Sequence, residues 1–184
     1  MVLEAQQYRT AVLDVPLAAD VGLTGLVDGA KQALLTGDAR SAVAKYKTAI
    51  TIAPDDGTLW LGLTRALLAV SGNDGNETAA LQRDATSAGW NAYQLLRTTV
   101  TRADVLSAIA VGLDRRDMYR PSLQAYEASL ALENSASVRA DYEDLKARKG
   151  FRVIEHTVDA DTSSPRVCAQ FSEELVKTGV DYAP

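Results

Sequence analysis

The sequence predicts an all-α array of paired helices followed by a short β tail, and three observations support this prediction. Residues 1–150 contain 27 of the 30 alanines, whereas residues 151–184 contain both phenylalanines. Apolar residues recur at spacings of three and four before Gly150, and they alternate with polar residues after it. Alanine favours helices, whereas aromatic and β-branched residues favour strands. We therefore place the boundary between a helical part and a β part near Gly150.

Residues 29–54 predict a helical hairpin with a tight turn. A first apolar run ends at Gly37, and a second begins after Asp38, whose side chain is suited to cap a helix. Pro54 ends the second helix, because the residue before a proline disfavours helical conformation. Tyr46 lies on the second helix between two alanines, at spacings of four and three, so a neighbouring helix can approach this face closely.

Two further units follow the first hairpin. The second unit has an apolar run that contains Trp60, then an insertion, and then a long helix over roughly 77–98. The third unit runs from Leu106, turns at Asp117 and has Tyr126 in the place that Tyr46 takes in the first unit. A last helix over 135–149, which is covered with charges and followed by a glycine, is typical of a terminal capping helix.

This pattern resembles the tetratricopeptide repeat, a helix-turn-helix unit of about 34 residues. The register is set by Pro54, and the signature positions are then occupied by Ala30, Gly37, Ala42, Tyr46, Ala49, Trp60 and Leu63. Ser122 and Ser129 depart from the pattern, because they stand where the third unit should have alanines. The resemblance therefore implies a short, irregular array of about three helical hairpins and a capping helix.

Five aromatic residues in the helical part are expected to be packing anchors between helices. Large rings on otherwise small helix faces contribute most of the apolar area that such an array can bury. These residues are Tyr46, Trp60, Trp90, Tyr93 and Tyr126.

The concave side of such an array is where a peptide or helix of a partner would bind. The residues expected on this side are Lys31, Leu61, Arg65 and Leu68, with Thr24, Val27, Asp28, Leu34, Leu35, Gly62 and Ala69 beside them. The Lys and Asn clamp that holds a C-terminal carboxylate in some members of the family is absent from these positions. We weigh an open groove against a groove covered by the long helix over 77–98, and we favour the covered groove because exposed apolar patches are uncommon.

Residues 151–184 predict two strands and a turn. The first strand begins near Phe151, the turn spans Asp159 to Pro165, and the second strand is Arg166 to Phe171. Two strands do not make a stable sheet alone. The strands therefore either pack on the helices or belong to a larger protein.

The tail resembles the opening of the first macroglobulin-type β-sandwich domain in bacterial α2-macroglobulin family proteins. The resemblance rests on residues 164–175, which read SPRVCAQFSEEL, and on residues 180–184, which read VDYAP. It implies a parent protein that traps proteases in the periplasm or cell envelope and has endopeptidase inhibitor activity. In some of these proteins a helical-repeat region precedes that domain.

Cys168 is the only cysteine, and the sequence after it reads Ala-Gln-Phe. This is not the Cys-x-Glu-Gln motif that forms a thioester in many members of the family, so we assign no thioester. The resemblance instead implies a disulfide with a cysteine outside this sequence, which would leave a free, half-buried thiol here. The alternative, a small strand residue with no special role, is weighed equally.

Several classes of function are disfavoured by the residues themselves. The net charge of −5 argues against nucleic acid, which needs a basic face. Apolar runs fall short of the roughly 18 residues of a membrane span, and polar residues interrupt the start where a signal peptide would need apolar ones. His156 is the only histidine and has no second ligand at a recognisable spacing, and no catalytic motif is present. We therefore expect no enzyme, no metal and no cofactor.

The expected domains are an N-terminal extension over 1–22, a tetratricopeptide-like domain over 23–150, and the first strands of an incomplete macroglobulin-like β-sandwich over 151–184. The expected function is a non-catalytic scaffold or protein-interaction module of an envelope protease inhibitor. Its partners would be proteins, neighbouring domains or, through the parent protein, target proteases. The alternative is a free-standing cytoplasmic adaptor that binds a partner peptide or helix in its concave groove.

Overall fold

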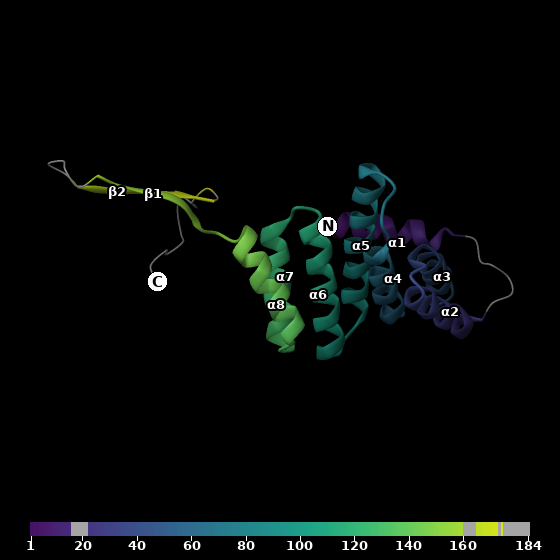
Figure 1. Cartoon of the computed structure of the whole chain (residues 1–184). Coiled ribbons are helices and arrows are strands. Elements are labelled where there is room, and N and C mark those ends of the chain that lie inside the picture. Colours follow the sequence, from purple (N-terminus) through teal and green to yellow (C-terminus); the bar gives the residue numbers. More distant parts are fainter. Residues whose placement is uncertain (16–21, 160–164, 173, 175–184) are drawn as a thin grey trace.

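Eight helices form the helical body in the described residues, and a two-stranded hairpin follows them (Figure 1). The computed structural model describes residues 1–15, 22–159, 165–172 and 174. The helices are α1 (Val2–Leu13), α2 (Leu23–Leu35), α3 (Ala39–Ile52), α4 (Gly57–Ala69), α5 (Gly75–Leu95), α6 (Thr99–Arg115), α7 (Tyr119–Leu132) and α8 (Ala136–Lys149). The pairs α2–α3, α4–α5 and α6–α7 are the three predicted hairpins, and α8 packs on α7 as the predicted capping helix. The predicted fold class is confirmed.

The turns of the first and third hairpins each contain one residue in the same backbone conformation. Gly37 has φ = 82° and Asp117 has φ = 58°, so both lie in the left-handed region that reverses the chain after a helix. In the first hairpin the Asp38 side chain then caps α3 by accepting a hydrogen bond from the Ser41 amide. The third turn places aspartate in the glycine position, which explains why its sequence signal is weaker than that of the first.

The long helix α5 begins two residues earlier than expected and ends three residues earlier. Asp74 caps it by accepting a hydrogen bond of 2.8 Å from the Glu77 amide. Because the helix begins at Gly75, most of the sequence insertion over 71–82 is helical. The helix packs against α4, α6 and α1. It therefore lies within the array and joins the second unit to the third.

The first helix is a finding that sequence reasoning did not anticipate. Residues 1–22 were set apart as an extension, yet α1 packs across α5 and α3 with Ala5 and Val12 buried. It runs across the repeat helices instead of along them (Figure 1). The helical body therefore includes α1.

The two serines at alanine positions of the third unit are accommodated because each donates a hydrogen bond to the preceding helix. The Ser122 hydroxyl donates a hydrogen bond of 2.7 Å to the carbonyl of Ala110, and Ser129 donates one of 2.8 Å to the carbonyl of Ala103. Both serines are buried. A small hydroxyl fits the close contact between α6 and α7 because its hydrogen bond removes the cost of burying it.

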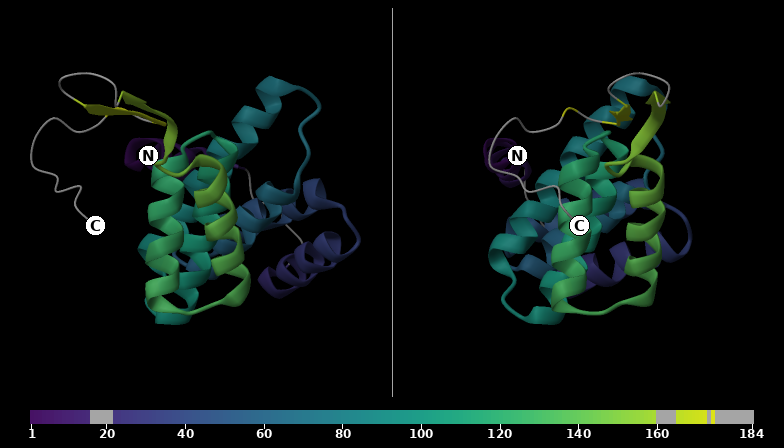
Figure 2. Two further views of the ribbon diagram at one scale, coloured as in Figure 1. Left: turned by 60° about the vertical axis from the view of Figure 1, so that its left-hand side comes forward. Right: turned by 90° about the vertical axis from the view of Figure 1, so that its left-hand side faces the viewer.

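The β tail forms an antiparallel hairpin of β1 (Val153–Asp159) and β2 (Arg166–Phe171). The turn residues 160–164 and most of the tail after 172 lie outside the described residues, as do the residues 180–184 of the macroglobulin resemblance. The hairpin projects away from the helices in Figure 1 and in the left view of Figure 2, and the residues of both strands are exposed except for the half-buried Phe171. Of the two alternatives for the tail, packing of the strands on the helices is therefore wrong.

Cys168 lies on β2 opposite Thr157, and its side chain is exposed. The expectation of a half-buried thiol is wrong, because no described part of the chain forms a second layer over the two-stranded hairpin, which leaves its strands exposed.

Candidate peptide-binding groove

An open groove of about 540 Å³ lies between the first helices of the first two units. It is formed by α2 on one side, α4 on the other, and one residue of α3 between them. The lining residues are Val27, Lys31, Leu34, Leu35, Tyr46, Thr58, Leu59, Leu61, Gly62 and Arg65.

Tyr46 reaches the groove because α4 has a glycine opposite it. A Cβ atom on Gly62 would lie 2.4 Å from Cε1 and 2.5 Å from Cζ of the Tyr46 ring. Since real side chains do not approach so closely, only glycine at this position lets the ring lie against the α4 backbone. Tyr46 is 5% exposed. Burial raises the pKa of its phenol, and the charge of Arg65 partly offsets this effect.

The groove has a buried floor and an exposed apolar edge. Leu59 and Leu61 are 3% and 7% exposed and hold the α4 side in place. Val27 and Leu34 are half-buried, whereas Leu35 is 82% exposed at the end of α2. Leu35 therefore has most of its apolar surface available to a second molecule.

Two cations lie on the edges of the groove. Lys31 is exposed and has no ion pair within the described part of the chain. Arg65 Nη2 lies 3.3 Å from Asp104 Oδ2 of α6, and both side chains are about half exposed. Because such an exposed ion pair is weak, a ligand carboxylate can compete with Asp104 for Arg65 at small cost.

Three of the four proposed groove residues meet in this groove, and one does not. Lys31, Leu61 and Arg65 line it, whereas Leu68 packs against Gly112 of α6. Tyr46 was expected to be a packing anchor only, and its place in the groove was missed. The signal that could have found it is Gly62, a glycine two residues after Trp60 within a largely apolar helix.

The long helix α5 contributes no residue to the lining of this groove. The interpretation that α5 covers the groove is therefore wrong. The reason is that α5 is the second helix of its unit and packs on the other side of α4, against α6 and α1.

The aromatic residues expected as anchors differ in burial. Trp60 is fully buried and donates a hydrogen bond of 2.9 Å to the Pro54 carbonyl, which also fixes the turn before α4. Tyr126 of α7 is buried in a cluster with Ala110 of α6 and Leu145 of α8, and burial and the charges of Asp141 and Asp114 raise its pKa to about 12. Trp90 and Tyr93 are half-buried and stack on each other with ring centroids 5.9 Å apart.

Other chemistry is not assembled in the described residues. His156 is exposed on β1 opposite Ala169. No group of three His, Cys, Asp or Glu side chains that could hold a metal ion occurs in the part of the chain that the structure describes. Among the described helices, none combines the length and the apolar content needed to cross a membrane.

The helix pairs give the described residues a tetratricopeptide-like helical fold, with a groove between the first helices of two units. The chain is similar to the solved structure of the Arabidopsis OM64 TPR domain, with a TM-score of 0.58 and 13% sequence identity. The match covers 68% of this chain and 94% of that chain, and at this identity it shows the fold alone. No protein-family model matches the chain, and no curated protein matches its sequence.

Proposed function

We propose that the chain is a protein-interaction module whose groove between α2 and α4 binds a short amphipathic segment of a partner protein. The observation that carries this proposal is the combination of a preformed apolar floor with Lys31 at its edge, which has no ion pair among the described residues. Repeat proteins of this kind generally bind protein partners on such surfaces. The fold sets the shape of the groove, and its apolar and cationic side chains determine which partner segments it prefers.

The partner segment follows from the residues of the groove. Apolar side chains at helical spacing would fill the space beside Tyr46, Leu61 and Leu34. Acidic residues beside them would pair with Lys31 and Arg65. Burying two or three apolar side chains yields roughly 1.5–3 kcal/mol each, and the cost of association and ordering offsets part of this gain, so we expect a weak, reversible complex.

A displayed library of random peptides of about 15 residues, selected on the purified chain, tests this proposal. The selected peptides should combine leucine or aromatic residues three or four positions apart with aspartate or glutamate. Their affinity, measured by calorimetric titration, should fall about tenfold or more for the Lys31→Glu/Arg65→Glu variant, because two attractive charge pairs become repulsive.

The matched control is Lys149→Glu/Arg97→Glu, which makes the same two charge reversals away from the groove. This variant should bind the selected peptides as the unchanged chain does. Equal loss of affinity in both variants would mean that net charge, not the groove, attracts the peptides. A selection that enriches only basic peptides would contradict the proposal outright.

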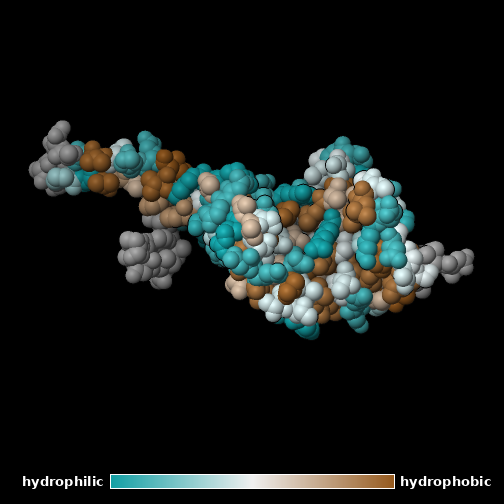
Figure 3. Space-filling model, turned by 60° about the horizontal axis from the view of Figure 1, so that its bottom comes forward, coloured by the Kyte–Doolittle hydropathy of each residue, from teal (hydrophilic) through white to brown (hydrophobic). Residues whose placement is uncertain are grey.

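A second candidate is supported by the hairpin: we propose that the chain belongs to an α2-macroglobulin-like protease inhibitor. Neighbouring cross-strand pairs of the hairpin, which lie on opposite faces, differ in polarity. Val158 and Val167 lie opposite each other and are 64% and 72% exposed, whereas the adjacent pair Asp159 and Arg166 is charged. Figure 3 shows apolar and polar residues next to one another along the hairpin. An alternating hairpin of this kind suits the edge of a larger sheet whose second layer covers the valines.

The genomic reading frame on both sides of this sequence tests the second candidate. A continuous frame that encodes sandwich domains after residue 184 supports an envelope inhibitor, in which Cys168 would find a disulfide partner. A frame without such domains would overturn it and leave the adaptor, which we would place in the cytoplasm. Groove binding is measured on this chain alone, so the two candidates are tested separately.

A further inference from the structure

The first helix contacts all three repeat units, although it precedes them in the sequence. It lies across α3 of the first unit and α5 of the second, and its side chains reach the turn between α6 and α7 of the third. In a linear array each unit normally contacts only its neighbours. The contacts of α1 therefore connect units that the repeat architecture alone leaves separate.

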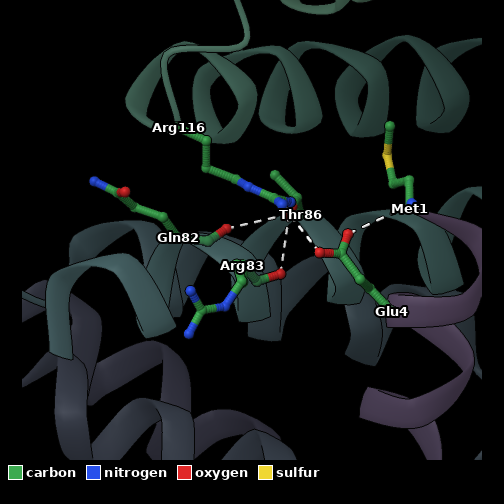
Figure 4. A network of polar contacts seen from close by, with 6 residues as sticks. All are labelled: Met1, Glu4, Gln82, Arg83, Thr86 and Arg116. Atoms are coloured by element: carbon green, nitrogen blue, oxygen red, sulfur yellow. Dashed lines mark hydrogen bonds and ion pairs between the residues drawn. The ribbon is translucent and has the colours of Figure 1, made fainter. Parts of the chain in front are cut away.

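At its start, α1 is bound to the third unit through an arginine. Arg116 Nη2 lies 3.1 Å from Glu4 Oε1, and Arg116 Nη1 donates a hydrogen bond of 2.6 Å to the Thr86 hydroxyl of α5 (Figure 4). The Thr86 hydroxyl in turn donates to the Arg83 carbonyl at 2.9 Å. Burial raises the pKa of the Glu4 carboxyl, but the hydrogen bond and charge of Arg116 outweigh this and lower it, so Glu4 stays ionised. One guanidinium thus joins α1, α5 and the turn after α6.

In its middle, α1 is held by a buried amide of the second unit. Asn91 is 6% exposed, and its Nδ2 donates hydrogen bonds of 2.9 Å to the Ala5 carbonyl and 3.0 Å to the Ser87 carbonyl. Ala5 is 1% exposed, and its small side chain lets the two helices approach closely enough for this bond. A larger residue at position 5 would separate α1 from Asn91.

Towards its end, α1 is bound to the junction of the first two units. Arg9 Nη2 lies 2.7 Å from Asp55 Oδ1, and its guanidinium carbon is 5.6 Å from the centroid of the Trp60 ring. Lys47 of α3 places its ammonium 5.6 Å from the centroid of the Tyr8 ring. The helix is therefore attached to the first, second and third units at separate points along its length.

We propose that α1 is a brace that makes the three repeat units open and unfold as one body. Without it, the stability of the array would be a sum over units and their interfaces, and the third unit could open by itself. With it, opening of the third unit must break the Glu4–Arg116 and Arg116–Thr86 contacts as well as the α5–α6 interface.

Hydrogen exchange followed by mass spectrometry on the whole chain tests the brace. In the unchanged chain, the slowest amides of α2–α3, α4–α5 and α6–α7 should exchange at a common rate. The Ala5→Gln/Val12→Gln variant enlarges the two buried α1 residues and leaves every repeat residue intact. In this variant the slowest amides of α6–α7 should exchange about tenfold or more faster than those of α4–α5.

The matched control is Thr10→Gln/Ala11→Gln, which changes two exposed positions of the same helix and should keep the common rate. If the buried double variant does not fold, Glu4→Gln decides, because it removes only the charge that faces Arg116 and should speed exchange of α6–α7 relative to α2–α3. Equal exchange rates in all three units of the Ala5→Gln/Val12→Gln variant would overturn the proposal. Independent rates in the unchanged chain would overturn it as well.

Discussion

Gly62 and Tyr46 form the contact on which the groove depends, and the sequence signals of the two residues are unequal. Tyr46 was identified as a packing residue because its spacing to small neighbours matches the repeat. Gly62 gives a weaker signal, since a glycine within a helix predicts by itself only a less stable helix and does not say that a ring packs against it. The groove residue Tyr46 was therefore missed for a physical reason: its role is set by the helix across from it.

Substitution of Gly62 by alanine should lower the free energy of unfolding by about 1–3 kcal/mol, because the new methyl group collides with the Tyr46 ring. Urea denaturation measures this change. Helix propensity alone predicts the opposite sign, a gain of up to about 1 kcal/mol.

The control for this prediction is Gly29→Ala in α2, where the nearest atoms are the flexible Cδ and Cε atoms of Lys45. Because that side chain can move aside, Gly29→Ala should leave stability unchanged or raise it. A Gly62→Ala protein as stable as Gly29→Ala would mean that Tyr46 does not lie against α4.

Asp84 on α5 should make the protein less stable as the pH rises. Burial raises the pKa of its carboxyl, although the charges of Lys47 and Arg83 partly offset the effect. The folded state then holds the proton more tightly than the unfolded state, whose pKa is about 3.9. Stability is therefore lost as the pH rises above that value, and the full cost is present at neutral pH.

The Asp84→Asn variant should accordingly unfold at higher urea concentration than the unchanged chain at about pH 7, and the difference should vanish near about pH 3. Urea midpoints at the two pH values measure this. A variant that is less stable than the unchanged chain at neutral pH would show that the charged carboxylate stabilises this site.

At the scale of the elements, a helix could be predicted wherever its residues carry a strong pattern or cap. The helices of the first hairpin were predicted because Gly37, Asp38 and Pro54 mark their ends. The first helix was missed because it buries only Ala5 and Val12, and a buried alanine gives no apolar periodicity. Leu68 was predicted to line the groove, but it lies near the end of α4, where it packs against Gly112 of the third unit.

The turn of the first hairpin should depend on its left-handed residue. Gly37→Ala should cost about 1–2 kcal/mol of folding free energy, because its φ of 82° brings a Cβ atom too close to the backbone. Urea denaturation again provides the measurement. Gly75→Ala is the control, since Gly75 begins α5 with nothing within 4 Å of a new methyl group, and it should not destabilise the protein. Equal stability of the two variants would contradict the role assigned to the turn.

At the scale of the whole molecule, the array offers an open apolar groove on one side and is held by a crossing helix on the other. The number and order of the helix pairs could be predicted, because each unit repeats the same local pattern. The side on which α5 lies could not, because it depends on how successive pairs stack and not on the residues of α5. The openness of the groove follows from that stacking.

The central claim is that the groove between α2 and α4 binds a partner segment. The most direct measurement is the amide NMR spectrum of the chain, titrated with the tightest peptide from the selection. Binding in the groove predicts chemical-shift changes centred on Leu34, Leu61 and Arg65, and their loss in the Lys31→Glu/Arg65→Glu variant. Changes confined to β1 and β2, or to α8, with the groove amides unmoved would contradict the claim.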